Sequence, residues 1–368
     1  PEPAGEGNFE AYLSGLRERA LNGDPAAARE LAVHYDVEGN AAETSKWMSE
    51  YVSLAEKRAN NGDVDSMLDL GKLFYTGSRL YPKNLERARD WFTRAADSGN
   101  AAAQYQVAVM ASQGAGGPKD EATAALYYKK SLQTWKKEAD DGDAKAALWA
   151  ALVYERKLVP DSSPEKSVPY LLQAAESGNL TAQGLLAFKY RDGLGVPQDA
   201  AKAVEWFEKA ASRKDLGAVM ELGIMFRDGK YLPPDREKAF HWFEKGAEWK
   251  DPYSMAALAD MLLEGTPSAE QAARALALYR EAAAVGYFPA ALKAAELLQN
   301  GKGGELDADE AYRLLRRVAD AAGDPKAMYM LAQVYYTRGD EAQGDSLMKA
   351  SAQAAYLPAM NRMARLHL

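Results

Sequence analysis

The chain has 368 residues, of which 47% are hydrophobic, a formal net charge of −8 and no cysteine. The lack of cysteine excludes disulfides, thiolate zinc sites and cysteine nucleophiles. The acidic balance and the lack of a basic stripe argue against DNA or RNA as a partner, because nucleic-acid binders need clustered cations to displace counterions from phosphates.

The first eight residues have the composition of a flexible tether. They are polar, rich in Pro and Gly, and begin at Pro1 without a methionine. Such a start resembles the segment that follows a removed leader or lipid anchor, although a chain trimmed for another reason would look the same. We therefore expect a tether over residues 1–8 and a periplasmic protein, with a cytoplasmic location as the alternative. No apolar run reaches the length of about 18 residues that a membrane span needs.

Residues 9–368 are predicted to form one array of repeated helix pairs. A junction of Gly and Asp or Asn, or of substitutes for them, returns at spacings of 32 to 43 residues, including four consecutive spacings of 36. Gly can take the left-handed conformation that ends a helix, and Asp or Asn can cap the next one. The junctions begin at Gly23, Gly62, Gly99, Gly142, Gly178, Lys214, Lys250, Gly286, Gly323 and Ala355.

The first helix of each pair, here called helix A, has a recurring stripe. A small residue stands four positions after the junction, and a pair of Leu or Ala with Gly or Ala begins four positions later. An aromatic or other large residue stands three positions after that pair, so the stripe lies on one side of a helix. The small members let a neighbouring helix dock closely. Clear pairs are Leu70-Gly71, Leu186-Ala187 and Leu222-Gly223.

The second helix, helix B, follows a Gly-rich turn such as residues 192–199. It has a bulky pair and then a small pair, and we expect the aromatic residues to pack between helices A and B. The small pair would let the following repeat approach. The unit after Gly99 departs from the pattern, with 43 residues and an insertion near 131–137. The three clearest copies are Trp91-Phe92 with Ala95-Ala96, Trp206-Phe207 with Ala210-Ala211, and Trp242-Phe243 with Gly246-Ala247.

This pattern resembles the Sel1-like repeat family, a tetratricopeptide-like family. The match runs from about Gly23 to the C-terminus and is sharpest between Gly178 and Gly286. The resemblance implies an all-α, right-handed superhelical solenoid of about nine helix-turn-helix repeats. Since one helix pair cannot bury both of its sides, stacked neighbours must complete the core.

The sequence offers no catalytic constellation, so we expect no enzyme, no metal and no cofactor. His34, His241 and His367 share no local spacing, and a structural or surface role is expected for each. The Gly-rich segments 114–117 and 301–304 resemble phosphate loops, but neither follows a strand or completes a P-loop, and both fall at A–B turns. The acidic runs 138–141 and 307–310 fall at helix ends, where carboxylates suit the helix dipole.

The resemblance places the partner in the concave groove, against the outward positions of helix A. The middle of that series is apolar, and a contiguous exposed apolar patch marks an interaction site. Tyr, Met and Arg are also common at interfaces. The alternative is that tight superhelical curvature buries these side chains. The candidate partner-binding residues are Tyr105, Leu148, Leu152, Arg156, Phe188, Arg191, Met220, Ile224, Arg227, Asp260 and Tyr329.

Three classes of function were compared, and we expect a non-enzymatic scaffold for another protein. The resemblance suggests three roles: a periplasmic immunity protein against a type VI-secreted phospholipase effector, an envelope adaptor for exopolysaccharide secretion, or a virulence or regulatory protein. An enzyme would need convergent acidic or histidine residues in the groove, and no such set is visible. A regulatory module would sense a small ligand or a signalling protein. The partner's identity and the oligomeric state stay open.

Overall fold

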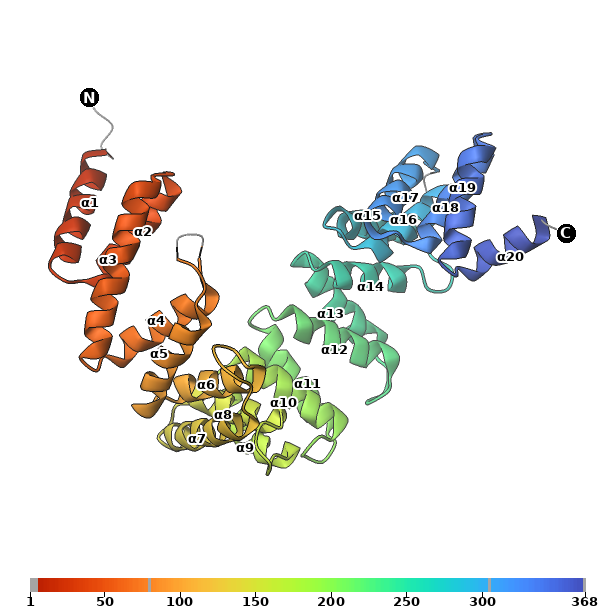
Figure 1. The fold of residues 1–368 in the computed structure, drawn as a ribbon. Coiled ribbons are helices and arrows are strands. Elements are labelled where there is room, and N and C mark those ends of the chain that lie inside the picture. The colour runs from red at the N-terminus through yellow and green to blue at the C-terminus, as the bar shows by residue number, and fades with distance from the viewer. Residues whose placement is uncertain (1–5, 79–80, 304–305, 367–368) are drawn as a thin grey trace. The chain divides into compact units, whose positions relative to one another are not determined.

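The computed structural model describes residues 6–78, 81–303 and 306–366, and within them all regular secondary structure is helical (Figure 1). The predicted all-α repeat solenoid is thereby confirmed. Most of the predicted tether and His367 lie outside the described residues, and α1 begins at Glu6. No described helix combines the length and the apolar character that crossing a membrane requires.

The contacts divide the chain into two compact units. The first unit holds residues 1–182 and 194–196, and the second holds residues 183–193 and 197–368. The single array over residues 9–368 stays a prediction. The helices up to α9 are α1 Glu6–Leu21, α2 Pro25–Val37, α3 Ala41–Asn60, α4 Val64–Thr76, α5 Leu85–Asp97, α6 Ala101–Gln113, α7 Glu121–Asp140, α8 Ala144–Glu155 and α9 Pro164–Glu176.

The remaining helices continue the alternation, with α10 starting in the last residues of the first unit. They are α10 Leu180–Asp192, α11 Ala200–Ala211, α12 Leu216–Asp228, α13 Arg236–Glu248, α14 Pro252–Leu262, α15 Ala269–Ala284, α16 Phe288–Asn300, α17 Ala308–Ala322, α18 Pro325–Thr337, α19 Glu341–Gln353 and α20 Leu357–Leu366. In the described residues, α2 to α19 make nine A–B pairs, preceded by α1 and followed by α20. Within each unit the close helix contacts join neighbours in the sequence.

Each repeat junction combines a helix stop with a helix start. The first residue of every junction named above has a φ between 59° and 100°, and at Lys214, Lys250 and Ala355 a residue with a side chain takes this left-handed conformation. The next helix is then capped in most repeats. For example, Asn100 accepts a hydrogen bond from the amide of Ala103 at 2.9 Å. The cap satisfies one of the amides that a helix start leaves without a partner.

The small residues of the repeat are where helices approach most closely. A Cβ atom on Gly71 of α4 would lie 2.7 Å from the ring of Phe92 on α5, and one on Gly223 of α12 would lie 2.4 Å from the ring of Phe243 on α13. Both aromatic residues belong to the bulky pair of helix B, and both are buried. Helix A therefore accepts the aromatic residue of helix B at a position that has no side chain.

Candidate partner-binding sites

Two candidate residues of the first unit, Tyr105 and Arg156, belong to one aromatic cluster. The ring of Tyr105, on α6, lies 5.5 to 5.7 Å from the rings of Tyr128, Trp135 and Trp149. Trp135 and Trp149 stack with their centroids 5.4 Å apart and an interplanar angle of 17°. Each of the helices α6, α7 and α8 contributes at least one of these rings. The cluster therefore includes both helix-A and helix-B residues.

Arg156, at the end of α8, completes this cluster. Its Nη1 donates a hydrogen bond to the hydroxyl oxygen of Tyr105 at 2.7 Å, which ties α8 to α6. The side chain is exposed, and the described residues supply no carboxylate that pairs with it. Leu148, Leu152 and Arg156 recur every four positions and so form one stripe on α8. The site thus places the guanidinium of Arg156, which has no carboxylate partner among the described residues, beside half-buried apolar side chains.

Sequence reasoning missed Trp149, which is half-buried and stands between the predicted positions. The predicted groove position was the residue two places before the Ala150-Ala151 pair, which is Leu148. Trp149 stands one place before that pair. A signal was available, since Trp149, Leu152 and Arg156 have helical spacings of three and four and therefore share a face.

In the second unit, Arg191 is held by carboxylates of the protein itself. Its guanidinium donates to both carboxylate oxygens of Asp192, at 2.9 and 2.8 Å, and to Oε2 of Glu221 on α12 at 2.7 Å. It also lies over the rings of Phe188 and Tyr231, at 4.7 and 5.3 Å. The side chain of Arg191 is only 18% exposed. Its hydrogen bond holds the pKa of Asp192 below the ordinary carboxyl value. This arginine therefore stabilises the repeat.

Two further charged candidates of the second unit also have partners. Nε of Arg227 donates to Oδ1 of Asp228 at 2.6 Å. Asp260 accepts hydrogen bonds from the Tyr279 hydroxyl and, at 3.2 Å, from Nζ of Lys293. Both Arg227 and Asp260 remain exposed, so these ion pairs contribute little to stability.

The apolar candidates share an intermediate burial that lies between the two predicted alternatives. They are neither fully exposed nor sealed inside the array, and each leaves part of its side chain accessible. The ring of Tyr329 packs at a tilt against that of Tyr356 with their centroids 5.4 Å apart, and Phe188 meets Phe207 edge-on at 5.1 Å. The half-buried candidates are Tyr105, Leu148, Leu152, Phe188, Met220, Ile224 and Tyr329.

The described histidines have the structural or surface positions that the sequence predicted. His34 packs edge-on against Phe9 at 5.3 Å, and the exposed His241 meets the ring of Trp242 at 5.3 Å. The part of the chain that the structure describes holds no cluster of three His, Asp or Glu that could bind a metal ion.

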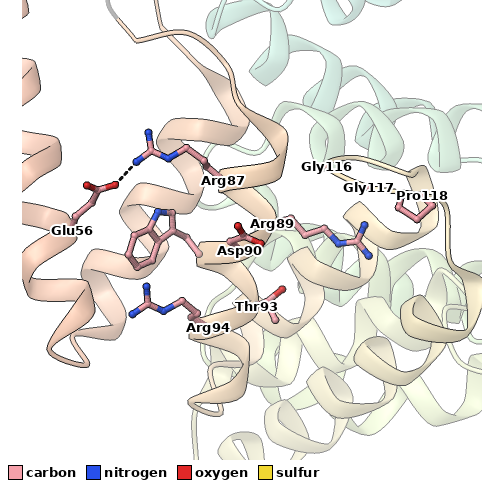
Figure 2. A pocket seen from close by; sticks show the side chains of 10 residues that line it. Glu56, Arg87, Arg89, Asp90, Thr93, Arg94, Gly116, Gly117 and Pro118 are labelled. Atoms are coloured by element: carbon pink, nitrogen blue, oxygen red, sulfur yellow. Dashed lines mark hydrogen bonds and ion pairs between the residues drawn. The ribbon is translucent and has the colours of Figure 1, made fainter.

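A second feature of the first unit is a pocket of about 770 Å³ beside α5, which sequence reasoning did not find (Figure 2). Arg87 pairs with Glu56 at one end. Arg94 lies 4.3 Å over the ring of Trp91. Arg89 extends in the other direction, toward the loop between α6 and α7, as Figure 2 shows. Three arginines of one helix therefore line a single pocket.

A model of the Sel1 repeat matches residues 64–100, 101–133, 181–215, 217–248, 252–287, 289–322 and 325–347, which is more than half of the chain. The chain belongs to the Sel1 repeat family. A search of the curated proteins found no match.

Solved structures of Sel1 repeat proteins share the fold. A Sel1 repeat protein from Oxalobacter formigenes is 26% identical, with a TM-score of 0.63, over 88% of this chain and 91% of the other. A protective antigen of uropathogenic Escherichia coli strains is 25% identical, with a TM-score of 0.57, over 96% of this chain and 78% of the other. An immunity protein from Pseudomonas aeruginosa is 17% identical over 60% of this chain and 81% of the other, and its TM-score of 0.29 carries no argument.

The Sel1 repeat model passes over residues 134–180. This stretch contains α8, with Trp149, Leu152 and Arg156. The consensus of the Sel1 repeat therefore does not account for these three side chains.

Proposed function

We propose that this Sel1 repeat protein is a non-enzymatic scaffold that binds a partner protein on the helix-A surface of its first unit. Repeats of this family generally serve as interaction scaffolds. The observation that carries the proposal is the hydrogen bond from Arg156 to Tyr105, which presents a guanidinium without a carboxylate partner beside half-buried aromatic rings.

The residue types at this site are those that dominate binding energy at protein interfaces. Trp, Tyr and Arg are enriched among residues whose truncation costs more than about 2 kcal/mol of binding free energy. Trp149 stacks on Trp135 and packs against the tilted ring of Tyr105, so these contacts restrict both side chains and little side-chain entropy is lost when a partner docks. Arg156 would pair with a carboxylate of the partner, while the rings and Leu152 would contact an adjacent apolar side chain. The expected partner surface is thus an acidic residue next to an apolar one.

The test uses the full chain to capture its partner from an extract of the source organism, followed by purification of that partner and calorimetry. Arg156→Gln and Trp149→Ala should each weaken the affinity at least tenfold, because both remove a central contact. Arg365→Gln, on the exposed surface of α20, is the matched control and should leave the affinity unchanged. Equal affinities for all the variants would refute this site.

Among the specific roles, we propose a periplasmic immunity protein that neutralises a type VI-secreted phospholipase effector. The resemblance to the Sel1-like family, in which such immunity proteins occur, supports this role. Adding the purified chain to such a phospholipase should inhibit hydrolysis at equimolar ratio, and cell fractionation should find the protein in the periplasm. Undiminished hydrolysis would reject this role.

Two alternative roles keep the scaffold but change the partner. One is an envelope adaptor for exopolysaccharide secretion, which rests on the resemblance alone. The other is a virulence or regulatory protein, which the similarity to the protective antigen of uropathogenic Escherichia coli supports. Identification of the captured partner separates these roles, since each requires a different class of protein.

A further inference from the structure

The pocket beside α5 holds an arginine, Arg89, that has no ion pair among the residues that the structure describes. Arg89 is half-buried, and in the described residues it has neither an ion pair nor a hydrogen bond. Its two neighbours in the pocket differ from it, because Arg87 pairs with Glu56 and Arg94 donates to Oδ1 of Asn60 at 2.9 Å. A half-buried cation without a partner has lost part of its hydration, so an anion that binds it recovers that free energy.

The guanidinium of Arg89 lies against the loop between α6 and α7. A Cβ atom on Gly117 would lie 2.6 Å from Nη1 of Arg89, so the side chain approaches the loop backbone closely. Gly116 has a φ of 70°, and a Cβ atom on it would lie 2.1 Å from the carbonyl oxygen of Leu85. The loop is therefore pressed against the first turn of α5, and the closeness of Arg89 to it is a consequence of the backbone path.

Further hydrogen-bond donors line the same pocket. Thr93 is one helical turn after Arg89 on α5, so both side chains lie on one face of the helix. The Thr93 hydroxyl and the amides of Gly116 and Gly117 have no acceptor in the part of the chain that the structure describes. Thr93, Gly116 and Gly117 all line the pocket with Arg89. Arginine, hydroxyl and loop amides together are a donor set for an oxyanion.

Three carboxylates lie in or beside the pocket and limit its charge, and the first, Glu56, is paired with Arg87. Asp90 also lines it, is exposed, and has no ion pair in the described residues. Asp120, the N-cap of α7, accepts hydrogen bonds from Thr123, and these bonds are the main reason why its pKa is lowered. The positive charge of Arg89 lowers the pKa of Asp120 further, by a smaller amount. Neither Asp90 nor Asp120 makes an ion pair with Arg89. The negative charge of Asp90 is thus expected to weaken the binding of an anion beside it.

We propose that this end of the pocket binds a compact oxyanion, held by the guanidinium of Arg89, the hydroxyl of Thr93 and the amides of the Gly116–Gly117 loop. The oxyanion is a phosphate group or the carboxylate of an acidic side chain, and the two share the chemistry of several acceptor oxygens on one centre. The site is independent of the aromatic cluster around Arg156. It gives the Gly-rich loop, which is a repeat turn rather than a P-loop, a second role.

The test is calorimetric titration of the full chain with sodium phosphate and, separately, with sodium acetate, at an ionic strength fixed by sodium chloride. Phosphate binding that exceeds acetate binding assigns the site to a phosphate group, and the reverse order assigns it to a carboxylate. Either result supports the proposal when Arg89→Gln weakens binding at least tenfold. Arg365→Gln, in the second unit, should leave binding unchanged.

Two further variants separate binding from stability. Thr93→Val keeps the shape of the side chain but removes its hydroxyl, and should weaken binding severalfold. Asp90→Asn should strengthen anion binding, because it removes the negative charge of a lining carboxylate that has no ion pair among the described residues. Binding no stronger than that of chloride, or binding that Arg89→Gln and Asp90→Asn leave unchanged, would overturn the proposal. A lower melting temperature of Arg89→Gln with unchanged anion affinity would show that Arg89 only supports the loop.

Discussion

Gly246 on α13 lies so close to Ser254 on α14 that a Cβ atom on the glycine would stand 2.1 Å from the serine Oγ. The serine cannot move aside freely, because its hydroxyl and its amide both donate to Oδ2 of Asp251. Gly246 belongs to the small pair of helix B, and Ser254 is the small residue of the next helix A. Their contact is how one repeat docks on the next in the second unit.

Gly246→Ala should therefore destabilise the second unit, although alanine is the better helix former. The clash is expected to cost about 1–3 kcal/mol, which outweighs the gain in helix propensity of about 1 kcal/mol. Urea unfolding followed by circular dichroism measures the change. Gly184→Ala on α10 is the matched control, because no atom lies within 4 Å of its Cβ position. The control should be neutral or stabilising, and equal losses for the two variants would contradict this account.

Arg191 and Arg156 are expected to differ in what their removal changes. Arg191→Met leaves Asp192 and the half-buried Glu221 without their cation, so we expect a loss of about 1–3 kcal/mol in the free energy of unfolding. Arg156→Gln removes one exposed hydrogen bond and should cost less than about 0.5 kcal/mol. Denaturant titration of both variants decides this. If Arg191→Met were as stable as the wild type, the role assigned to the Arg191 ion pairs would be wrong.

The junction at Lys214 offers a stabilising substitution. Lys214 has a φ of 63°, a conformation that costs a residue with a side chain about 1 kcal/mol and costs glycine very little. Lys214→Gly should raise the free energy of unfolding by about 0.5–1 kcal/mol. The reverse change at an equivalent junction, Gly142→Lys with its φ of 100°, should lower it. Thermal unfolding of both variants tests the pair, and a fall in stability for Lys214→Gly would contradict the prediction.

Tyr336 is predicted to make stability fall at alkaline pH. Burial and, next, the hydrogen bond to Asp345 raise the pKa of Tyr336 to about 12, from an ordinary value of 10.0. Between pH 10 and pH 12 the unfolded chain loses this proton while the folded chain keeps it. The stabilisation is therefore complete below pH 10 and disappears as the pH rises through 12.

Urea unfolding of wild type and Tyr336→Phe at several pH values from 9 to 12 measures this effect. The stability of the wild type should fall more steeply than that of the variant. Asp345→Asn removes the charged acceptor of the Tyr336 hydroxyl, so the extra slope should shrink in that variant as well. Parallel curves for wild type and Tyr336→Phe would rule out this contribution.

The helices and their junctions were predictable because the same residue types recur at the same positions of each repeat. A junction residue with positive φ, a cap such as Asn100 and small positions such as Gly71 and Gly223 act through short-range geometry. Such features are visible in one sequence, because the register of the repeats aligns them. The handedness of the predicted superhelix and its concave groove stay predictions.

The candidate site was less predictable because it depends on contacts between repeats. Tyr105 and Arg156 are 51 positions apart, and only the packing of α6, α7 and α8 brings them together. The sequence analysis placed Arg191 in the groove and did not foresee its pairing with Asp192 or, across from α10 to α12, with Glu221. Arg89 was overlooked because it lies on helix B, and the search for a site followed helix A.

Because each helix packs mainly against the helices before and after it, evolution can add or remove whole helix pairs. A copied or deleted helix pair would meet its new neighbours through the same small positions, of which Gly246 and Ser254 are one example. The length of such a chain can therefore change by whole repeats without redesign of the rest. A repeat that has lost the family consensus, such as the one carrying α8, is free to acquire side chains that serve a single lineage.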